Sequence, residues 1–158
     1  TGKGGECVMS VSGYPDQQDE KRDRIMLGIL RANYSKVWAW IQTTEDESYL
    51  DRLPGGSELK RIYSLKRYRE ALREGNVDYV GTRLHGGVFA MQNGCRSLII
   101  SIDHRAQGFH ETNNLPILDR REVESGLERA INGALVTDIK INQKAIAAFK
   151  SQFVGSNQ

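Results

Sequence analysis

Apolar strand-like runs alternate with amphipathic helical segments along the chain, and this alternation constrains the fold more than any other feature. Strand patterns are expected at residues 7–12, 37–41, 61–63, 77–80, 97–102 and 117–118. Helical patterns follow at residues 19–33, 45–53, 65–74, 88–92, 122–131 and 142–153. Strands joined through helices form parallel sheets by right-handed crossovers. The sequence therefore predicts an α/β, Rossmann-like three-layer domain with a mostly parallel sheet.

Three details of this pattern make further predictions. The run Ser97–Ile102 is the most hydrophobic strand pattern, so we expect it near the centre of the sheet. Ser64 is placed to cap the helix 65–74, which Gly75 ends. We expect Trp38 and Trp40 to belong to the core rather than to a carbohydrate platform.

Size and charge narrow the class of protein. The 158 residues suit one domain, and 22 basic and 20 acidic residues are well mixed along the chain. No basic stripe predicts nucleic-acid binding, and no run of about 18 apolar residues predicts a membrane span. Two cysteines, Cys7 and Cys95, indicate a reduced, cytoplasmic protein with no disulfide framework, and no metal motif is present. Because the chain starts at Thr1 without an initiator Met, we expect a fragment of a longer protein.

The segment Val77–Gly87 carries the strongest functional signal. A short strand pattern ends at Gly81-Thr82 and is followed by Arg83, Leu84 and His85 before a glycine pair and a helix. Ligands of open α/β sheets bind outside the carboxyl ends of the strands, and helix N-termini attract anions. Arg83 adds a fork suited to phosphate or carboxylate, and His85 adds a group that titrates near neutral pH. The segment predicts an anion site.

Other charged residues also follow strand patterns. His104 and Arg105 come directly after residues 97–102, so we expect them to face the same cleft. For Asp46 and Asp103 the favoured interpretation is capping of a helix or turn. His110 and Glu111 lie in an irregular stretch where a functional role is the less favoured interpretation. For Arg83 the alternative to a ligand clamp is a surface salt bridge to a glutamate.

The chain up to about Leu118 resembles the C-terminal half of the polysaccharide pyruvyl transferases. Four pieces carry this resemblance in order: Arg83-Leu84-His85, the small-residue segment 86–92 with Gly94, the strand 97–102, and Asp103 with Arg105. Upstream, Gln42 followed by Glu45-Asp46 is similar to the family's Gln and Glu-Asp after the second strand. The chain departs from the family at Ser12-Gly13-Tyr14, where an Arg is common, and at residues 102–105, where Tyr-Asp-x-Lys is common.

The resemblance implies one lobe of a GT-B-like two-domain enzyme of exopolysaccharide biosynthesis in the cell envelope. Such an enzyme transfers pyruvate from phosphoenolpyruvate to a hydroxyl pair of a sugar or lipid-linked glycan acceptor, forming a ketal. The donor is a substrate, and neither a cofactor nor a metal is implied. The other wall of the cleft would be an N-terminal α/β half of the same parent, and the enzyme would be cytoplasmic, at the inner face of the membrane.

The residues that match the family motif take their expected roles from it. Arg83 and His85 are the expected catalytic and donor-binding pair, with Arg83 clamping the phosphate or carboxylate and His85 bonding the phosphate. Leu84 would line the site with its backbone, and Gly86 and Gly87 would let the donor approach closely. His104 and Arg105 complete the expected substrate-binding set.

Two other functions remain open at this stage. One is the nucleotide-sugar lobe of a GT-B glycosyltransferase, in which two carboxylates eight residues apart hold the ribose and the sugar. Glu111 and Asp119 have that spacing, although Pro116 and a strand pattern lie between them. The other is a lobe that recognises a glycan or another ligand without catalysing its reaction.

Overall fold

The computed structural model describes residues 2–102 and 114–135 of the chain. Within them a six-stranded sheet, parallel throughout, has the order β3-β2-β1-β4-β5-β6. The strands are β1 (Glu6–Ser10), β2 (Lys36–Trp40), β3 (Lys60–Ile62), β4 (Val77–Gly81), β5 (Ser97–Ser101) and β6 (Ile117–Asp119). The helices are α1 (Glu20–Asn33), α2 (Thr44–Arg52), α3 (Leu65–Glu74), α4 (Leu84–Gln92) and α6 (Val123–Asn132). Short 3₁₀ turns cover Pro15–Gln17, Gly56–Glu58 and Arg120–Glu122.

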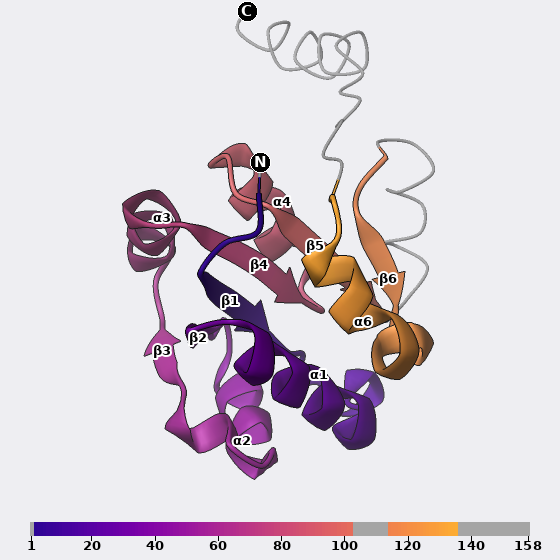
Figure 1. Cartoon of the computed structure of the whole chain (residues 1–158). Coiled ribbons are helices and arrows are strands. Elements are labelled where there is room, and N and C mark those ends of the chain that lie inside the picture. The colour runs from indigo at the N-terminus through magenta and orange to yellow at the C-terminus, as the bar shows by residue number, and fades with distance from the viewer. Residues whose placement is uncertain (1, 103–113, 136–158) are drawn as a thin grey trace, which may run out of the picture.

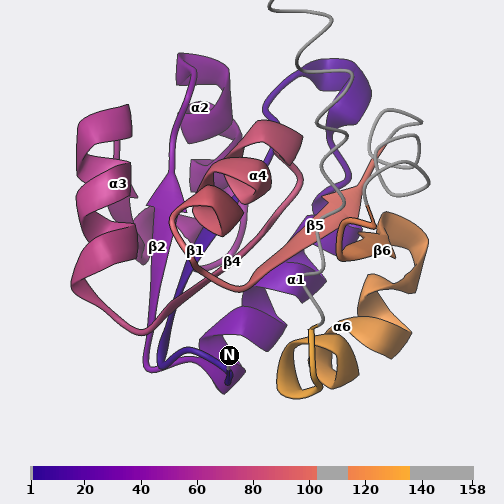
Figure 2. The same ribbon diagram turned by 90° about the horizontal axis from the view of Figure 1, so that it is seen from above.

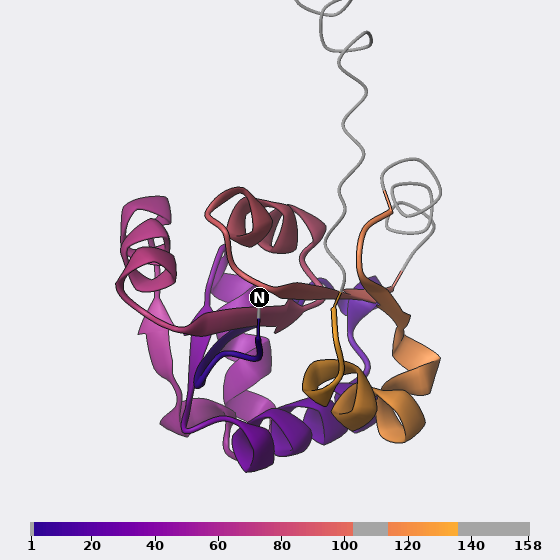
Figure 3. The same ribbon diagram turned by 45° about the horizontal axis from the view of Figure 1, so that its top comes forward.

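The sheet lies between two layers of helices, which confirms the predicted Rossmann-like α/β fold. The chain steps outward from β1 to β3 and then crosses back through β4 toward β6. Right-handed crossovers place helices on opposite faces when this direction reverses. Accordingly α1, α2 and α6 cover one face, and α3 and α4 cover the other (Figures 1 and 3). The helix expected at 142–153 falls outside the described residues.

Local sequence signals explain where the helices begin. Asp19 accepts a hydrogen bond from the Arg22 N–H at 3.1 Å and caps α1, and Thr43 caps α2 through the Asp46 N–H. Ser64 caps α3 as predicted, because its hydroxyl accepts from the Arg67 N–H at 3.2 Å. Such caps satisfy N–H groups that the helix itself leaves unpaired.

Each face of the sheet has its own hydrophobic core. Under α1 and α6 the core includes Met9, Leu30 and Leu127, and these side chains are almost fully buried. Under α3 and α4 it is aromatic: Trp40 and Tyr68 stack with ring centroids 4.4 Å apart. Helix α4 packs against β4 and β5, as Figure 2 shows.

Two sequence predictions are wrong in detail. The strand at 97–101 lies next to the β6 edge, whereas β1 and β4 form the centre. Its hydrophobicity reports burial on both faces, since all five residues are buried, and not its lateral position. Trp40 is a core residue as expected, but Trp38 is only partly buried and lines a groove. No helix in the described ranges is long and apolar enough to cross a membrane.

Candidate functional site

The strand order reverses between β1 and β4, and the segment that carries Arg83 and His85 leaves the sheet there. On one side of this boundary the chain continues toward β2, and on the other toward β5. The crevice outside the carboxyl ends of two such strands is the usual ligand site of an open α/β sheet. The first βα turn, Ser10–Gln17, has a single glycine and lacks the glycine pattern of dinucleotide-binding folds.

Two side chains and the backbone of Arg83 connect β1 and β4 at this point. The hydroxyls of Ser10 and Tyr79 are 2.6 Å apart, and Tyr79 donates to the Arg83 carbonyl at 2.7 Å. Because Tyr79 uses its proton there, Ser10 donates to Tyr79 and accepts from the Arg83 N–H at 3.3 Å. Burial raises the pKa of Tyr79 above its ordinary value, so the phenol stays protonated. This network fixes the backbone of Arg83.

The Arg83 guanidinium forms a buried ion pair with Asp46, which follows the end of β2. The Asp46 side chain is 1% exposed and also accepts from the Gly13 N–H at 2.8 Å and the Gln42 N–H at 3.3 Å. Arg83 thus forms a salt bridge, as its alternative interpretation expected, but the partner is the buried Asp46 and not a surface glutamate, and the simple cap expected of Asp46 is wrong because Thr43 caps α2. One carboxylate connects the segments that follow β1, β2 and β4.

Arg83 retains hydrogen-bonding capacity beyond this pair. Its side chain is 15% exposed, and its buried Nε has no partner in the described part of the chain. The guanidinium carbon lies 5.0 Å from the ring centroid of Tyr14, which is exposed. Thr82 is also buried, and its hydroxyl lacks a partner among the same residues. Both atoms are buried and therefore do not themselves face a ligand, so the accessible capacity of Arg83 lies in the part of its guanidinium that is exposed.

Helix α4 starts directly after Arg83, earlier than the predicted residue 88. Its first two N–H groups, those of Leu84 and His85, have no acceptor in residues 2–102 and 114–135. The next two, of Gly86 and Gly87, bond to the Arg83 carbonyl at 3.0 and 3.2 Å. The His85 side chain is exposed. The helix start therefore offers two N–H donors and an exposed imidazole, and the Arg83 residue that precedes it pairs with Asp46.

Gly86 and Gly87 have a packing reason to be glycines. A Cβ atom on Gly86 would lie 2.5 Å from the Trp40 ring, and one on Gly87 would lie 2.7 Å from Ile99. Both residues are buried against the sheet, and the Gly86 carbonyl accepts from the Tyr68 hydroxyl at 2.8 Å. Close packing of α4 thus explains the glycine pair without a bound donor. Leu84 is partly buried and packs near Met91 and Ile99.

The remaining predicted residues divide into two groups. Asp103, His104, Arg105, His110 and Glu111 lie outside the described residues. Asp119 is described, and Arg121 binds both of its carboxylate oxygens, at 2.7 and 3.0 Å. Hydrogen bonds from the Arg121 side chain and N–H lower the pKa of Asp119 to about 2. Asp119, which a nucleotide-sugar site would use, is therefore already paired with Arg121.

A second buried ion pair lies at the same edge of the sheet. Arg120, which follows β6, approaches Asp23 of α1 at 3.3 Å and donates to the Gln17 carbonyl at 2.7 Å. The Tyr49 hydroxyl donates to Asp23 at 2.5 Å. Burial raises the pKa of Asp23, and the nearby Arg120 only partly opposes that effect. This cluster ties the end of β6 to α1 and α2.

Sequence reasoning missed Ser10, Tyr79 and the role of Asp46. Ser10 ends β1 and Asp46 lies in the first turn of the helix after β2, so both were detectable from their position, whereas Tyr79 lies within β4 and has no such signal. In the described part of the chain, no group of three or more His, Cys, Asp or Glu residues is arranged to hold a metal ion. No protein-family model, curated protein or solved structure shows a significant similarity to the chain.

Proposed function

We propose that this chain is the C-terminal lobe of a pyruvyl transferase that uses phosphoenolpyruvate as donor. The observation that carries the proposal is the position of Arg83 and His85 at the start of α4, beside the strand-order reversal. Consecutive residues supply the N–H groups of Leu84 and His85, a guanidinium and an exposed imidazole at this helix start. The ordered motif that resembles the pyruvyl transferases supplies the reaction.

The donor carries a phosphate and a carboxylate, and the site offers matching groups. The N–H groups of Leu84 and His85, at the positive end of α4, suit the phosphate. The imidazole of His85 adds a hydrogen bond to the same group. Arg83 binds the carboxylate or a phosphate oxygen with the N–H groups that Asp46 leaves free, because Asp46 orients the guanidinium from its buried side.

Ketal formation joins two acceptor hydroxyl oxygens to C2 of the donor and cleaves the bond from C2 to the phosphate oxygen. One hydroxyl proton is balanced by protonation of the enol carbon, which becomes a methyl group. The other leaves with inorganic phosphate. His85 is the proposed general acid or base, because imidazole is the side chain that most often transfers protons in catalysis, and the fixed N–H donors and Arg83 stabilise charge on the departing phosphate.

The acceptor in this proposal is a sugar or lipid-linked glycan of the cell envelope. An upstream α/β half of the parent protein supplies the other wall of the cleft. The enzyme acts in the cytoplasm, at the inner face of the membrane where lipid-linked precursors are assembled.

Ligand-induced stabilisation tests the proposal. Phosphoenolpyruvate should raise the melting temperature of this chain, and uridine diphosphate should not. His85→Ala should remove most of the shift, and Arg83→Lys should reduce it while keeping a cation beside Asp46. Arg73→Ala, which removes an exposed cation near the other edge of the sheet, is the matched control.

The outcomes separate the candidate functions. Stabilisation by uridine diphosphate alone would favour the nucleotide-sugar lobe of a glycosyltransferase. A full phosphoenolpyruvate shift in both variants would show that Arg83 and His85 do not bind the donor. No shift with either ligand would contradict donor binding by this chain.

A further inference from the structure

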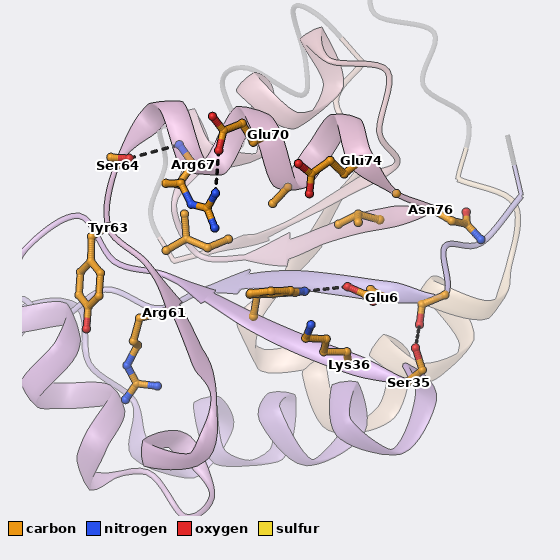
Figure 4. Close-up of a pocket in the computed structure, with 16 residues that line it drawn as sticks. Glu6, Ser35, Lys36, Arg61, Tyr63, Ser64, Arg67, Glu70, Glu74 and Asn76 are labelled. Atoms are coloured by element: carbon orange, nitrogen blue, oxygen red, sulfur yellow. Dashed lines mark hydrogen bonds and ion pairs between the residues drawn. The ribbon is translucent and has the colours of Figure 1, made fainter.

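A groove of about 740 Å³ lies at the opposite, amino-terminal edge of the sheet. It is lined by the start of β1, β2 and β4, by α3, and by residues 61–64 at the end of β3. In Figure 4, Arg67, Glu70 and Glu74 of α3 lie on one side of the groove, and Glu6 and Lys36 of the strands lie on the other. The two ends of a five-residue strand are about 13 Å apart. The groove is therefore separate from the site at Arg83 and His85.

The short edge strand β3 explains why this groove is open. β2 begins at Lys36, but its first partner in β3 is Lys60, which lies opposite Trp38. The first two residues of β2 thus have no neighbour in β3. Helix α3 packs inward through Tyr68 and Leu72 and leaves its polar side chains over the uncovered floor.

Trp38 is a fixed aromatic surface in this groove. Its indole Nε1 donates to the Glu6 carboxylate at 2.7 Å, and the Lys36 ammonium lies 3.7 Å from the ring centroid. The side chain remains partly exposed, in contrast to the stacked and buried Trp40. A ring held by two neighbours loses little conformational freedom when a ligand binds.

The charges of the groove are balanced. Arg61 also lines the groove, but Asp51 and the carbonyls of Gly56 and Leu59 already bind its guanidinium. The groove is then lined by three carboxylates and two cations, namely Glu6, Glu70, Glu74, Lys36 and Arg67, and the Lys60 ammonium lies 5.6 Å from the Trp38 ring centroid. Arg67 and Glu70 also pair with each other at 2.9 Å. This balance favours an uncharged ligand over a phosphate or a polyamine.

From these features we infer that the groove binds a neutral oligosaccharide. A sugar ring presents C–H groups to the negative face of an aromatic ring, and its hydroxyls donate to carboxylates and accept from guanidinium or amide groups. Glu70, Glu74 and Asn76 supply those partners along the groove, whose volume is typical of small-ligand sites. This inference depends on the groove alone and holds whether or not the chain transfers pyruvate.

Titration of the 158-residue chain with cellotetraose and maltotetraose, followed by NMR, tests the inference. At least one sugar should shift the Trp38 indole N–H resonance at concentrations up to about 10 mM, the range of weak binding. The affinity should be the same at low and high salt, because no net charge is involved. Inorganic phosphate should leave this resonance unchanged.

Variants distinguish a binding role from a structural one. Trp38→Ala should weaken sugar binding about tenfold or more, and the exposed Glu74→Gln should weaken it less without affecting the fold. Tyr14→Ala removes an exposed aromatic ring at the other edge of the sheet and should leave sugar affinity unchanged.

Two results would overturn the inference. One is no response of the parent chain to either sugar, and the other is a sugar affinity equal to the parent's in both the folded Trp38→Ala and the folded Glu74→Gln variants. Phosphoenolpyruvate titrated in parallel reports on the other site. Sugar binding without donor binding would refute the transferase proposal only, and donor binding without sugar binding would refute the groove only.

Discussion

Replacing Arg83 by alanine should destabilise the fold as well as remove a ligand-binding group. The guanidinium is the cationic partner of Asp46, whose side chain is 1% exposed. Without Arg83, the Asp46 carboxylate keeps only the N–H groups of Gly13 and Gln42 as partners. A buried carboxylate that loses its cation bears the full cost of desolvation.

The size of the effect follows from this burial. Removing one member of a buried ion pair costs roughly 3–5 kcal/mol, and because Arg83 is itself 15% exposed we expect about 3 kcal/mol. For a chain of this length each kcal/mol lowers the melting temperature by roughly 2–4 °C. Arg83→Ala should therefore melt about 6–12 °C below the parent chain.

Urea unfolding of four proteins measures the interaction: the parent, Arg83→Ala, Asp46→Asn and the double variant. In Asp46→Asn the side chain keeps an acceptor for the Gly13 N–H but has no charge to leave unpaired. The free energy of unfolding of the double variant should therefore be at least about 1 kcal/mol higher than the sum of the two single losses predicts. Arg121→Ala, which breaks an ion pair whose cation is exposed, should leave the midpoint unchanged. An Arg83→Ala midpoint equal to the parent's would refute the buried-pair reasoning.

Two further predictions concern the packing of α4 and the effect of pH. Gly86→Ala should lower the free energy of unfolding measured in urea by about 1–3 kcal/mol, because the new methyl group would overlap the Trp40 ring; an unchanged free energy would mean that α4 lies farther from the sheet. Burial raises the pKa of Asp23 above 3.8, so the folded state holds the Asp23 proton more tightly than the unfolded state does. The contribution of this proton to the free energy of unfolding is therefore lost as pH rises from 3.8 through the folded pKa. Unfolding free energies measured across this range should show the loss in the parent and not in Asp23→Asn, and equal pH profiles would contradict the assignment.

The sequence predicts the elements of the fold well because their signals are local. Ser64 and Gly75 mark the ends of α3, and the alternation of patterns requires parallel strands. The order of the strands in the sheet is harder to predict. Strand 97–101 is hydrophobic because helices cover both of its faces, and strands at several positions of a parallel sheet are covered in the same way. The order follows only from crossovers that span the whole chain.

The candidate site is less predictable because its contacts are distant in sequence. Arg83 and Asp46 are 37 residues apart, and only the order of β2, β1 and β4 brings them together. The glycine pair after His85 illustrates a second difficulty. A glycine required by packing against Trp40 and one required by ligand approach give the same letter in the sequence.

In the proposed donor site, the N–H groups of Leu84 and His85 at the start of α4 bind phosphoenolpyruvate. Two-dimensional ¹H–¹⁵N NMR during titration with phosphoenolpyruvate measures this directly. We expect these two amide resonances to move most and His85→Ala to suppress the response. Unchanged resonances at Leu84 and His85, with or without shifts elsewhere in the chain, would contradict this expectation.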